Sequence, residues 1–320
     1  MSEKRHLYQV DYIRAFASLS VAVFHLGGKV LPVLKYGWLG VEMFFVLSGF
    51  IICKAMPRDY SLKMSGRFIL KRIVRIEPPY IISLVLLLVL NFLTEPNYHP
   101  GWGNVLLHIG YLNNFFNKPY LNPVYWTLGV EFQYYIFIAL LFPLIIKSYG
   151  KWLIIILSIL PLFLHIQAQV LWNFFPLFAI GISCFLFTSG RISKILFIIF
   201  MFSTGTCSFL LLGWLETAVG LFTALILLMP LKRNGIISFF SNISFSLYLT
   251  HDIVGSRMVV YIGTLLPKTN LYKGGIFIAG IGISILTAWI FYRLIEKPFF
   301  DRSKAISYTP AAGAKTAMPA

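Results

Sequence analysis

Charged residues are scarce in this sequence, and acidic ones are the scarcest. The 320 residues include 11 acidic and 27 basic side chains, so only 12% are charged, whereas 58% are hydrophobic. A typical soluble domain has about 25% charged and about 45–50% apolar residues. This balance excludes an ordinary water-soluble domain and predicts that most of the chain lies in lipid.

Cysteine is also rare. The three cysteines, Cys53, Cys184 and Cys207, stand inside apolar stretches, and no Cys-x-x-Cys pair or histidine spacing suits a zinc site. We therefore expect buried thiols and no bound metal.

Two further patterns are missing. The N-terminus has no short apolar segment followed by a small-residue cleavage site, so we expect the first apolar stretch to remain as a spanning helix. The net charge is +16, but the basic residues stand between apolar runs rather than in an aromatic-interleaved surface domain. We therefore expect no nucleic-acid partner.

Long apolar stretches dominate what is present. A spanning helix needs about 20 mostly apolar residues, and the sequence predicts an all-α integral membrane protein with about ten such helices. The predicted spans are 8–27, 38–55, 76–94, 125–146, 152–168, 171–188, 193–211, 212–230, 236–262 and 274–295. The reversal between the seventh and eighth spans falls either at 203–205 or at 212–213.

The basic residues follow these spans in an alternating pattern. One alternate set of connections holds 20 lysines and arginines, and the other set holds 5. Because positive charge accumulates on the cytoplasmic side, both termini are predicted to be cytoplasmic and the segment 95–124 to face outward. We expect a transmembrane domain over 1–302 and a disordered cytoplasmic tail over 303–320, which is rich in Ala, Pro, Thr and Ser.

The first predicted span carries three ionisable residues, Asp11, Arg14 and His25. Ionisable groups at membrane depth are costly and mark functional sites by default. Arg14 and His25 are eleven residues apart, which places them on one helix face with a separation of about 16 Å. The alternatives are a buried Asp11–Arg14 ion pair that fixes helix packing, and a His25 side chain that only makes an interhelical hydrogen bond.

The predicted topology brings other polar residues to the depth of His25. Glu42, Glu131, His251 and Asp252 all fall in the outer parts of their spans. A histidine beside a carboxylate can remove a proton from an incoming hydroxyl. A proton relay in a transporter needs similar residues, so this pattern alone leaves both functions open.

A basic segment precedes the third span. Arg67, Lys71, Arg72 and Arg75 form a ridge just before a predicted proline-terminated turn. Guanidinium groups suit bidentate binding of phosphates such as those of coenzyme A. The alternative is that these residues only set the topology and contact anionic lipid headgroups.

Taken in order, these residues resemble the acyltransferase 3 family, integral-membrane enzymes that O-acetylate O-antigens, exopolysaccharides and related glycans. Thr127 stands where serine is usual in that family. The resemblance runs from Tyr8 to Phe299 and rests on Asp11, Arg14-x10-His25, the stretch 40–50 (GVEMFFVLSGF), Arg67 to Pro78 with Arg72-x-x-Arg75, 126–131 (WTLGVE) followed by Tyr134 and Tyr135, 243–251 (ISFSLYLTH), and 296–299 (EKPF).

The resemblance implies roles for these residues. His25 and Arg14 would be essential to transfer, Arg72 and Arg75 would contribute to acyl-CoA handling, and Trp126 and Glu131 would line the site. From the residues themselves we further expect Glu131 and Asp11 to complete the catalytic set and Arg67 to bind the acyl-CoA donor, expected to be acetyl-CoA, together with Arg72 and Arg75. Because aromatic rings and amides suit sugar rings and hydroxyls, we also expect the acceptor to enter past Trp102, Asn113 and Asn114 and to contact Trp126, Glu42, Tyr134 and His251.

The sequence therefore predicts an O-acyltransferase of the cell inner (plasma) membrane. It would move an acyl group to a hydroxyl of a surface glycan or lipid-linked sugar, in contact with membrane lipid and with glycan-synthesis partners. His25, supported by Glu131 or Glu42, would act as general base or would carry the acyl group transiently. A proton-coupled transporter or glycan exporter is the alternative function, and a non-catalytic membrane scaffold is a third.

Overall fold

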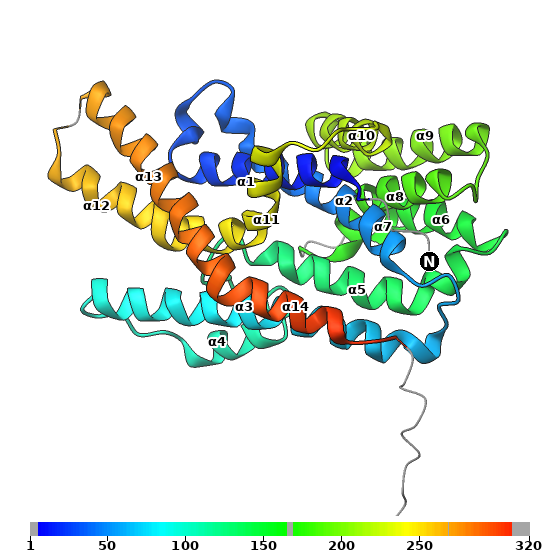
Figure 1. The fold of residues 1–320 in the computed structure, drawn as a ribbon, viewed down its shortest axis with the longest axis horizontal. Coiled ribbons are helices and arrows are strands. Elements are labelled where there is room, and N and C mark those ends of the chain that lie inside the picture. Colours follow the sequence, from blue (N-terminus) through cyan, green and yellow to red (C-terminus); the bar gives the residue numbers. More distant parts are fainter. Residues whose placement is uncertain (1–5, 165–168, 268, 309–320) are drawn as a thin grey trace, which may run out of the picture.

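The computed structural model describes residues 6–164, 169–267 and 269–308, and the regular elements within these ranges are all helical (Figure 1). The α-helices are α1 (Tyr8–His25), α2 (Gly40–Ala55), α3 (Ser65–Thr94), α4 (Trp102–Ile109), α5 (Trp126–Ile145), α6 (Leu153–Ile159), α7 (Pro161–Leu164), α8 (Leu171–Thr188), α9 (Lys194–Leu211), α10 (Trp214–Leu228), α11 (Gly235–Thr250), α12 (Arg257–Leu265), α13 (Asn270–Phe291) and α14 (Lys297–Ala305). Short 3-10 turns are η1 (Gly28–Val30), η2 (Leu34–Leu39), η3 (Leu62–Met64) and η4 (Gly150–Trp152), and two π-helical turns are η5 (His251–Ser256) and η6 (Tyr292–Glu296).

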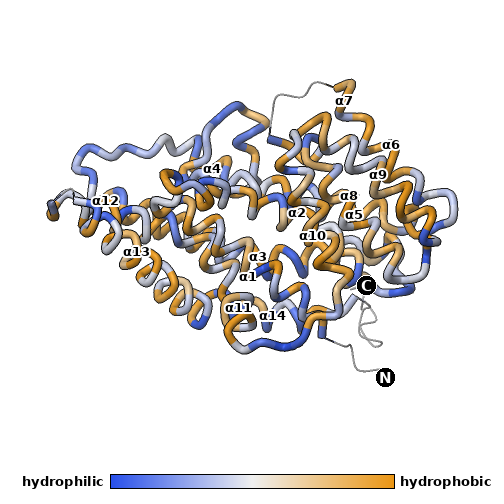
Figure 2. Tube along the Cα trace, turned by 90° about the horizontal axis from the view of Figure 1, so that it is seen from above, coloured by the Kyte–Doolittle hydropathy of each residue, from blue (hydrophilic) through white to orange (hydrophobic). Residues whose placement is uncertain are grey.

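Six helical stretches are long and apolar enough to span a membrane. They are Leu34–Ala55, Leu62–Thr94, Trp126–Ile145, Leu171–Thr188, Lys194–Leu211 and Asn270–Ala305, and shorter apolar helices cover Gly150–Leu164 and Trp214–Leu228. Figure 2 shows apolar residues along the helices and hydrophilic ones mainly in the connections. The prediction of an all-helical membrane protein is confirmed, whereas the count of ten spans and the side of each terminus stay predictions.

Contacts between distant residues show where the chain returns to the same end of the bundle. We call the end that contains Asp11 the inner end and the end that contains His25 the outer end. Arg191 donates to the Ile146 carbonyl at 3.4 Å, although α6, α7 and α8 lie between them in sequence. At the opposite end, Asn114 donates to the Gln169 carbonyl at 2.6 Å. The stretch 152–164, although short, therefore carries the chain from one end of the bundle to the other; residues 165–168 of its predicted span lie outside the described ranges.

The reversal between α9 and α10 falls at 212–213, one of the two positions that the sequence allows. Gly213 adopts φ +111° and caps the N-terminus of α10. This backbone conformation is accessible to glycine at little cost. Ser203 and Gly205, the other candidates, lie inside α9.

The predicted turn before the third span is wrong. α3 runs unbroken through Pro78 and Pro79 for 30 residues, about 45 Å at the α-helical rise. A proline inside a helix removes one backbone hydrogen bond and crowds the preceding turn. Here α3 makes tertiary contacts on both sides of the prolines, because the Arg75 guanidinium lies 4.8 Å from the Phe300 ring centroid of α14 and the Tyr80 hydroxyl donates to the His108 carbonyl at 3.2 Å. These contacts help to hold the helix through the prolines. The basic ridge consequently lies on the helix itself rather than in a loop.

Glycines bring α2 close to two neighbours. A Cβ atom at Gly49 would lie 2.2 Å from the Phe178 carbonyl oxygen of α8, and one at Gly181 would lie 2.0 Å from the Val46 carbonyl oxygen. At the outer end, a Cβ at Gly40 would lie 2.4 Å from the Ala17 carbonyl oxygen of α1. The start of α2 is therefore held against α1, which places Glu42 near the outer half of that helix.

The C-terminal helix returns to the inner end of α3. α13, η6 and α14 form one continuous rod, and α14 packs against α3 (Figure 1). Beyond α14, the carbonyls of Ile306 and Ser307 accept hydrogen bonds from Lys71 and Arg67, at 3.4 and 3.2 Å. The first residues of the predicted tail thus contact the basic ridge, and its remainder, 309–320, lies outside the described ranges.

Candidate active site

The inner half of α1 is joined to α11 by two pairs of polar side chains. Ser241 donates to Asp11 at 2.9 Å, and Arg14 donates through Nε to Ser244 at 3.1 Å. On each helix the two side chains are three positions apart and so lie on one face. The two hydrogen bonds can therefore form side by side between α1 and α11. Asp11 also contacts His6 at 2.7 Å, and among the described residues it forms no ion pair with Arg14.

His25 lies at the outer end of the same helix, as the eleven-residue spacing predicts. Its Nδ1 is 4.0 Å from Asp252 Oδ1, and its ring centroid is 5.3 Å from that of His251. Both partners belong to the π-helical turn η5. Such turns occur frequently at functional sites, and this one places two adjacent residues beside His25.

The tautomer of His251 follows from its hydrogen bond. Nδ1 lies 2.8 Å from the Leu247 carbonyl oxygen, and because a carbonyl only accepts, Nδ1 carries the proton. Nε2 is buried and has no partner among the described residues. Nε2 therefore offers an unused lone pair on the ring that lies beside His25.

A cavity of about 310 Å³ opens beside His25. Glu42 and Trp126 line it, together with Gln169 and Glu216. Glu42 is 4% exposed, and its Oε2 makes no hydrogen bond within the described part of the chain. We call this space the outer cavity; its complete lining is Val21, His25, Trp38, Val41, Glu42, Pro123, Val124, Trp126, Gln169, Phe174, Leu212, Glu216 and Tyr248.

A hydroxyl pair closes one wall of the outer cavity. Tyr248 donates to the Val124 carbonyl at 2.9 Å, and its oxygen lies 2.6 Å from Thr127 Oγ1. Threonine supplies the same hydroxyl as the serine that is usual at this position. The substitution at Thr127 therefore preserves the link between α5 and α11.

Glu131 lies deeper than the outer cavity. It accepts a hydrogen bond of 2.5 Å from Ser48 in the middle of α2, and it is not among the residues that line the cavity. The carboxylate that the structure places beside His25 is Asp252, whereas the sequence pointed to Glu131 or Glu42. Glu42 shares the cavity with His25, but Glu131 does not.

Tyr134 packs into the protein core. Its hydroxyl donates to the Gly49 carbonyl at 3.2 Å and lies 3.6 Å from the Cys53 sulfur. The side chain is completely buried and stacks on Phe178, with ring centroids 4.4 Å apart. The structure thus places Tyr134 in the packing of α2 against α5 and α8 rather than on the cavity wall.

The basic ridge divides into inward and outward members. The Arg72 guanidinium lies 5.7 Å from the Tyr135 ring centroid, and its Nε is buried with no partner among the described residues. The Arg75 guanidinium lies 4.8 Å from the ring centroid of Phe300 in α14. Arg67 faces outward toward the segment after α14. Arg72 and Arg75 therefore point donors into the bundle, as phosphate binding requires.

Sequence reasoning assigned no role to Glu296, which the structure places at the centre of the inner half. It is 6% exposed and accepts hydrogen bonds from the Ser246 amide and hydroxyl at 3.1 and 2.6 Å. Arg14 binds Ser244, two positions before Ser246 on α11, and Arg75 stacks on Phe300, one turn after Glu296. A buried carboxylate near two guanidinium groups offsets their charge and helps to hold them in place. The sequence did contain a signal for Glu296, because 296–299 is one of the motifs that carry the resemblance.

The outer segment between α3 and α5 is held by its own hydrogen bonds. Asn113 is fully buried and donates to Asn104 at 2.7 Å. His108 accepts from the Leu121 amide at 3.1 Å, and burial lowers the pKa of its imidazole. Trp102 is 62% exposed, and only Asn114, through its bond to Gln169, approaches the outer cavity. Asn113 therefore stabilises this segment and is not exposed to an incoming acceptor.

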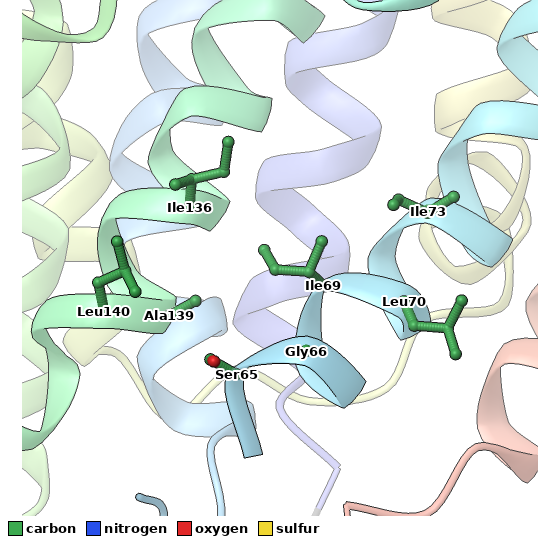
Figure 3. A pocket seen from close by; sticks show the side chains of 8 residues that line it. All are labelled: Ser65, Gly66, Ile69, Leu70, Ile73, Ile136, Ala139 and Leu140. Carbon is green, nitrogen blue, oxygen red and sulfur yellow. The ribbon is translucent and has the colours of Figure 1, made fainter. Parts of the chain in front are cut away.

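A second hollow is an apolar groove between α3 and α5. Figure 3 shows Ile136, Ala139 and Leu140 of α5 on one side of the groove and Ser65, Gly66, Ile69, Leu70 and Ile73 of α3 on the other. Its volume is about 430 Å³, and its lining includes no titratable side chain. The groove holds none of the predicted site residues. Within the described ranges, no cluster of three or more His, Cys, Asp or Glu residues is placed to hold a metal ion.

Comparison with known proteins finds a matching family model. The acyltransferase 3 model, described as an acyltransferase domain, matches residues 7–293. The "Putative acetyltransferase ORF330" of Acidianus two-tailed virus is 32% identical over 169 residues, which make up 51% of this chain and 48% of that protein. The O-acetyltransferase OatA of Staphylococcus aureus is 28% identical over 163 residues, 46% of this chain and 26% of that protein. The matches thus span about half and about a quarter of these two relatives, and no solved structure matches.

Proposed function

Because the chain belongs to the acyltransferase 3 family, whose model covers most of its length, we propose that it is a membrane O-acyltransferase. It transfers an acyl group, expected to be acetyl, from cytosolic acyl-CoA to a hydroxyl of a cell-surface glycan or lipid-linked sugar. The six apolar helices and the family make it a multi-pass membrane protein, and we place it in the cell inner membrane.

The observation that carries the proposal is the position of His25. This side chain lines the outer cavity and has Asp252 Oδ1 at 4.0 Å. In our mechanism the neutral imidazole takes the proton of the acceptor hydroxyl while the hydroxyl oxygen attacks the thioester carbonyl. The carbon–sulfur bond then breaks, and the His25 imidazolium gives its proton to the departing thiolate, so that coenzyme A leaves as a thiol and His25 is neutral again. Asp252 stabilises the imidazolium that forms, which favours the general-base route over an acyl-histidine.

The donor side of the proposal uses Arg72 and Arg75. Arg72 has a buried donor without a partner, and an unpaired buried guanidinium nitrogen is costly unless a ligand satisfies it. A phosphate group of coenzyme A fits this requirement in charge and geometry. The thioester then has to reach from the level of Arg14 to that of His25, about 16 Å along α1.

The test is acyl transfer in proteoliposomes. Radiolabelled acetyl-CoA is supplied with a mixed surface-glycan extract, and the wild type is compared with His25→Ala and with His99→Ala, a matched change at an exposed histidine. We expect label in glycan from the wild type and from His99→Ala, and a loss of at least about 100-fold in His25→Ala.

Two outcomes would contradict the proposal in different ways. Full activity of a folded His25→Ala protein would remove this residue from the mechanism. Failure of the wild type to transfer label from any acyl-CoA would argue against the transferase and favour a proton-coupled transporter.

A further inference from the structure

Two carboxyl groups face the outer cavity beside His25. Glu42 comes from α2 and Glu216 from α10, and both line the same cavity. Glu42 Oε2 is buried without a hydrogen-bond partner in the described part of the chain. A buried carboxyl oxygen needs a hydrogen-bond partner to offset its desolvation, and a hydroxyl group in the cavity can serve as that partner.

Glu216 stands in the first turn of α10, three positions after the N-cap residue Gly213. Glu42 lies inside the continuous helical stretch Leu34–Ala55. The positive end of a helix dipole favours an ionised carboxylate in its first turn. The Glu216 carboxylate, in a lining without lysine or arginine, therefore makes the outer cavity electronegative, although the whole chain has a net charge of +16.

The remaining lining suits a polyhydroxyl ligand. Trp38 and Trp126 supply aromatic faces, Gln169 supplies an amide and Tyr248 a hydroxyl, and the lining contains no lysine or arginine. Lys29 lies nearby, but its ammonium group is stacked 5.0 Å from the Phe24 ring centroid and is not part of the lining. Carboxylates accept hydrogen bonds from hydroxyl and ammonium groups, whereas an anionic ligand would be repelled.

We infer that the outer cavity selects its acceptor by charge. It admits neutral or amino-bearing sugars, whose hydroxyl or ammonium groups donate to Glu42 and Glu216, and it excludes acidic sugars such as uronic acids and sugar phosphates. The sugar hydroxyl to be acylated faces His25. The identification of the cavity as the acceptor site rests on the proposed function, but the charge selection can be measured without catalysis.

The experiment measures sugar binding to the full chain in nanodiscs by saturation-transfer difference NMR. The probes are methyl β-glucopyranoside and methyl β-glucuronide, which differ only in the group at C6. We expect the wild type to bind the neutral sugar at least about tenfold more tightly. This ratio falls toward one in Glu216→Gln and in the double variant Glu42→Gln/Glu216→Gln, and it is unchanged in Glu95→Gln, which removes an exposed carboxylate elsewhere.

The outcomes separate this inference from the proposed function. Equal binding of the two probes by the wild type, absence of saturable binding of the neutral sugar, or an unchanged ratio in the glutamine variants would overturn the inference. Glu216 is only half-buried, so the single variant carries the test if the double variant does not fold. Charge-selective binding without acyl transfer would contradict the proposed function alone, whereas label appearing equally on neutral and acidic glycans would contradict the charge selection alone.

Discussion

The chemistry at His25 depends on a residue that follows it by more than two hundred positions. Asp252 stands 4.0 Å from the imidazole, and His251 lies on the same turn with an unused ring nitrogen. A carboxylate beside a histidine base orients the ring and lowers the cost of its protonation in the transition state. The pair is therefore a more direct explanation of base catalysis than His25 with Glu131, whose carboxylate is bound to Ser48.

Replacing Asp252 tests this pairing at the scale of one side chain. We expect Asp252→Asn to reduce kcat by about 100-fold with little change in the KM for acyl-CoA, because the donor phosphates are proposed to bind at the inner end. Steady-state transfer in proteoliposomes gives both constants.

Asp301→Asn is the control for Asp252. Asp301 is an exposed aspartate of α14 that pairs with Lys297 at 2.7 Å, and its loss is expected to leave both constants unchanged. An unaltered kcat in Asp252→Asn, or an effect confined to the KM for acyl-CoA, would contradict the role of this carboxylate.

The close approach of α2 and α8 is the helix contact that most strongly shapes the packing of the core. Gly49 and Gly181 bring the two backbones together, because any larger side chain would overlap a carbonyl oxygen of the opposite helix. Small residues at helix contacts are the usual means of close packing in membranes. The same contact fixes Ser48, and through it Glu131, at a defined depth.

A methyl group at Gly49 should therefore destabilise the bundle. We expect Gly49→Ala to cost about 1–3 kcal/mol, because the obstacle is the Phe178 carbonyl in the backbone of α8 and not a movable side chain. Gly282→Ala, in α13 with no atom within 4 Å of the added Cβ, should cause no loss. The midpoints of thermal unfolding in detergent compare the two, and equal midpoints would refute the packing argument.

The whole molecule is a bundle in which the chain repeatedly returns to the same end. Gln9 at the start of α1 donates to the Leu227 carbonyl at the end of α10, at 3.4 Å. Arg191 likewise meets Ile146 across α6, α7 and α8. These contacts show that the chain returns to one end of the bundle, and the count of ten crossings stays a prediction.

Cysteine labelling tests the resulting topology. We expect Lys118→Cys to react with a membrane-impermeant maleimide in intact cells, and Tyr149→Cys and Arg191→Cys to react only after permeabilisation. The three natural cysteines are buried and give the unlabelled background. Labelling of Arg191→Cys in intact cells would show that 152–168 does not span the membrane and would reduce the count.

Apolar runs and polar exceptions in the sequence were enough to predict a helical membrane protein and the placement of Arg14 and His25 on one helix face. Long apolar segments have to be helical in lipid because their backbone groups find no other partner there, and helical periodicity then fixes which residues share a face. The ordered motifs likewise identified the family that the comparison shows.

Only the tertiary structure decided which carboxylates accompany His25, where Tyr134 lies and how Glu216 and Glu296 enter the polar clusters. These outcomes depend on how far each helix is shifted along its neighbours. Glycine contacts and π-helical turns set that shift, and both depend on the three-dimensional packing of the helices. Helical continuity through Pro78 and Pro79 was equally hidden, because local proline chemistry argues against it and only the tertiary contacts of Arg75 and Tyr80 on either side oppose that preference.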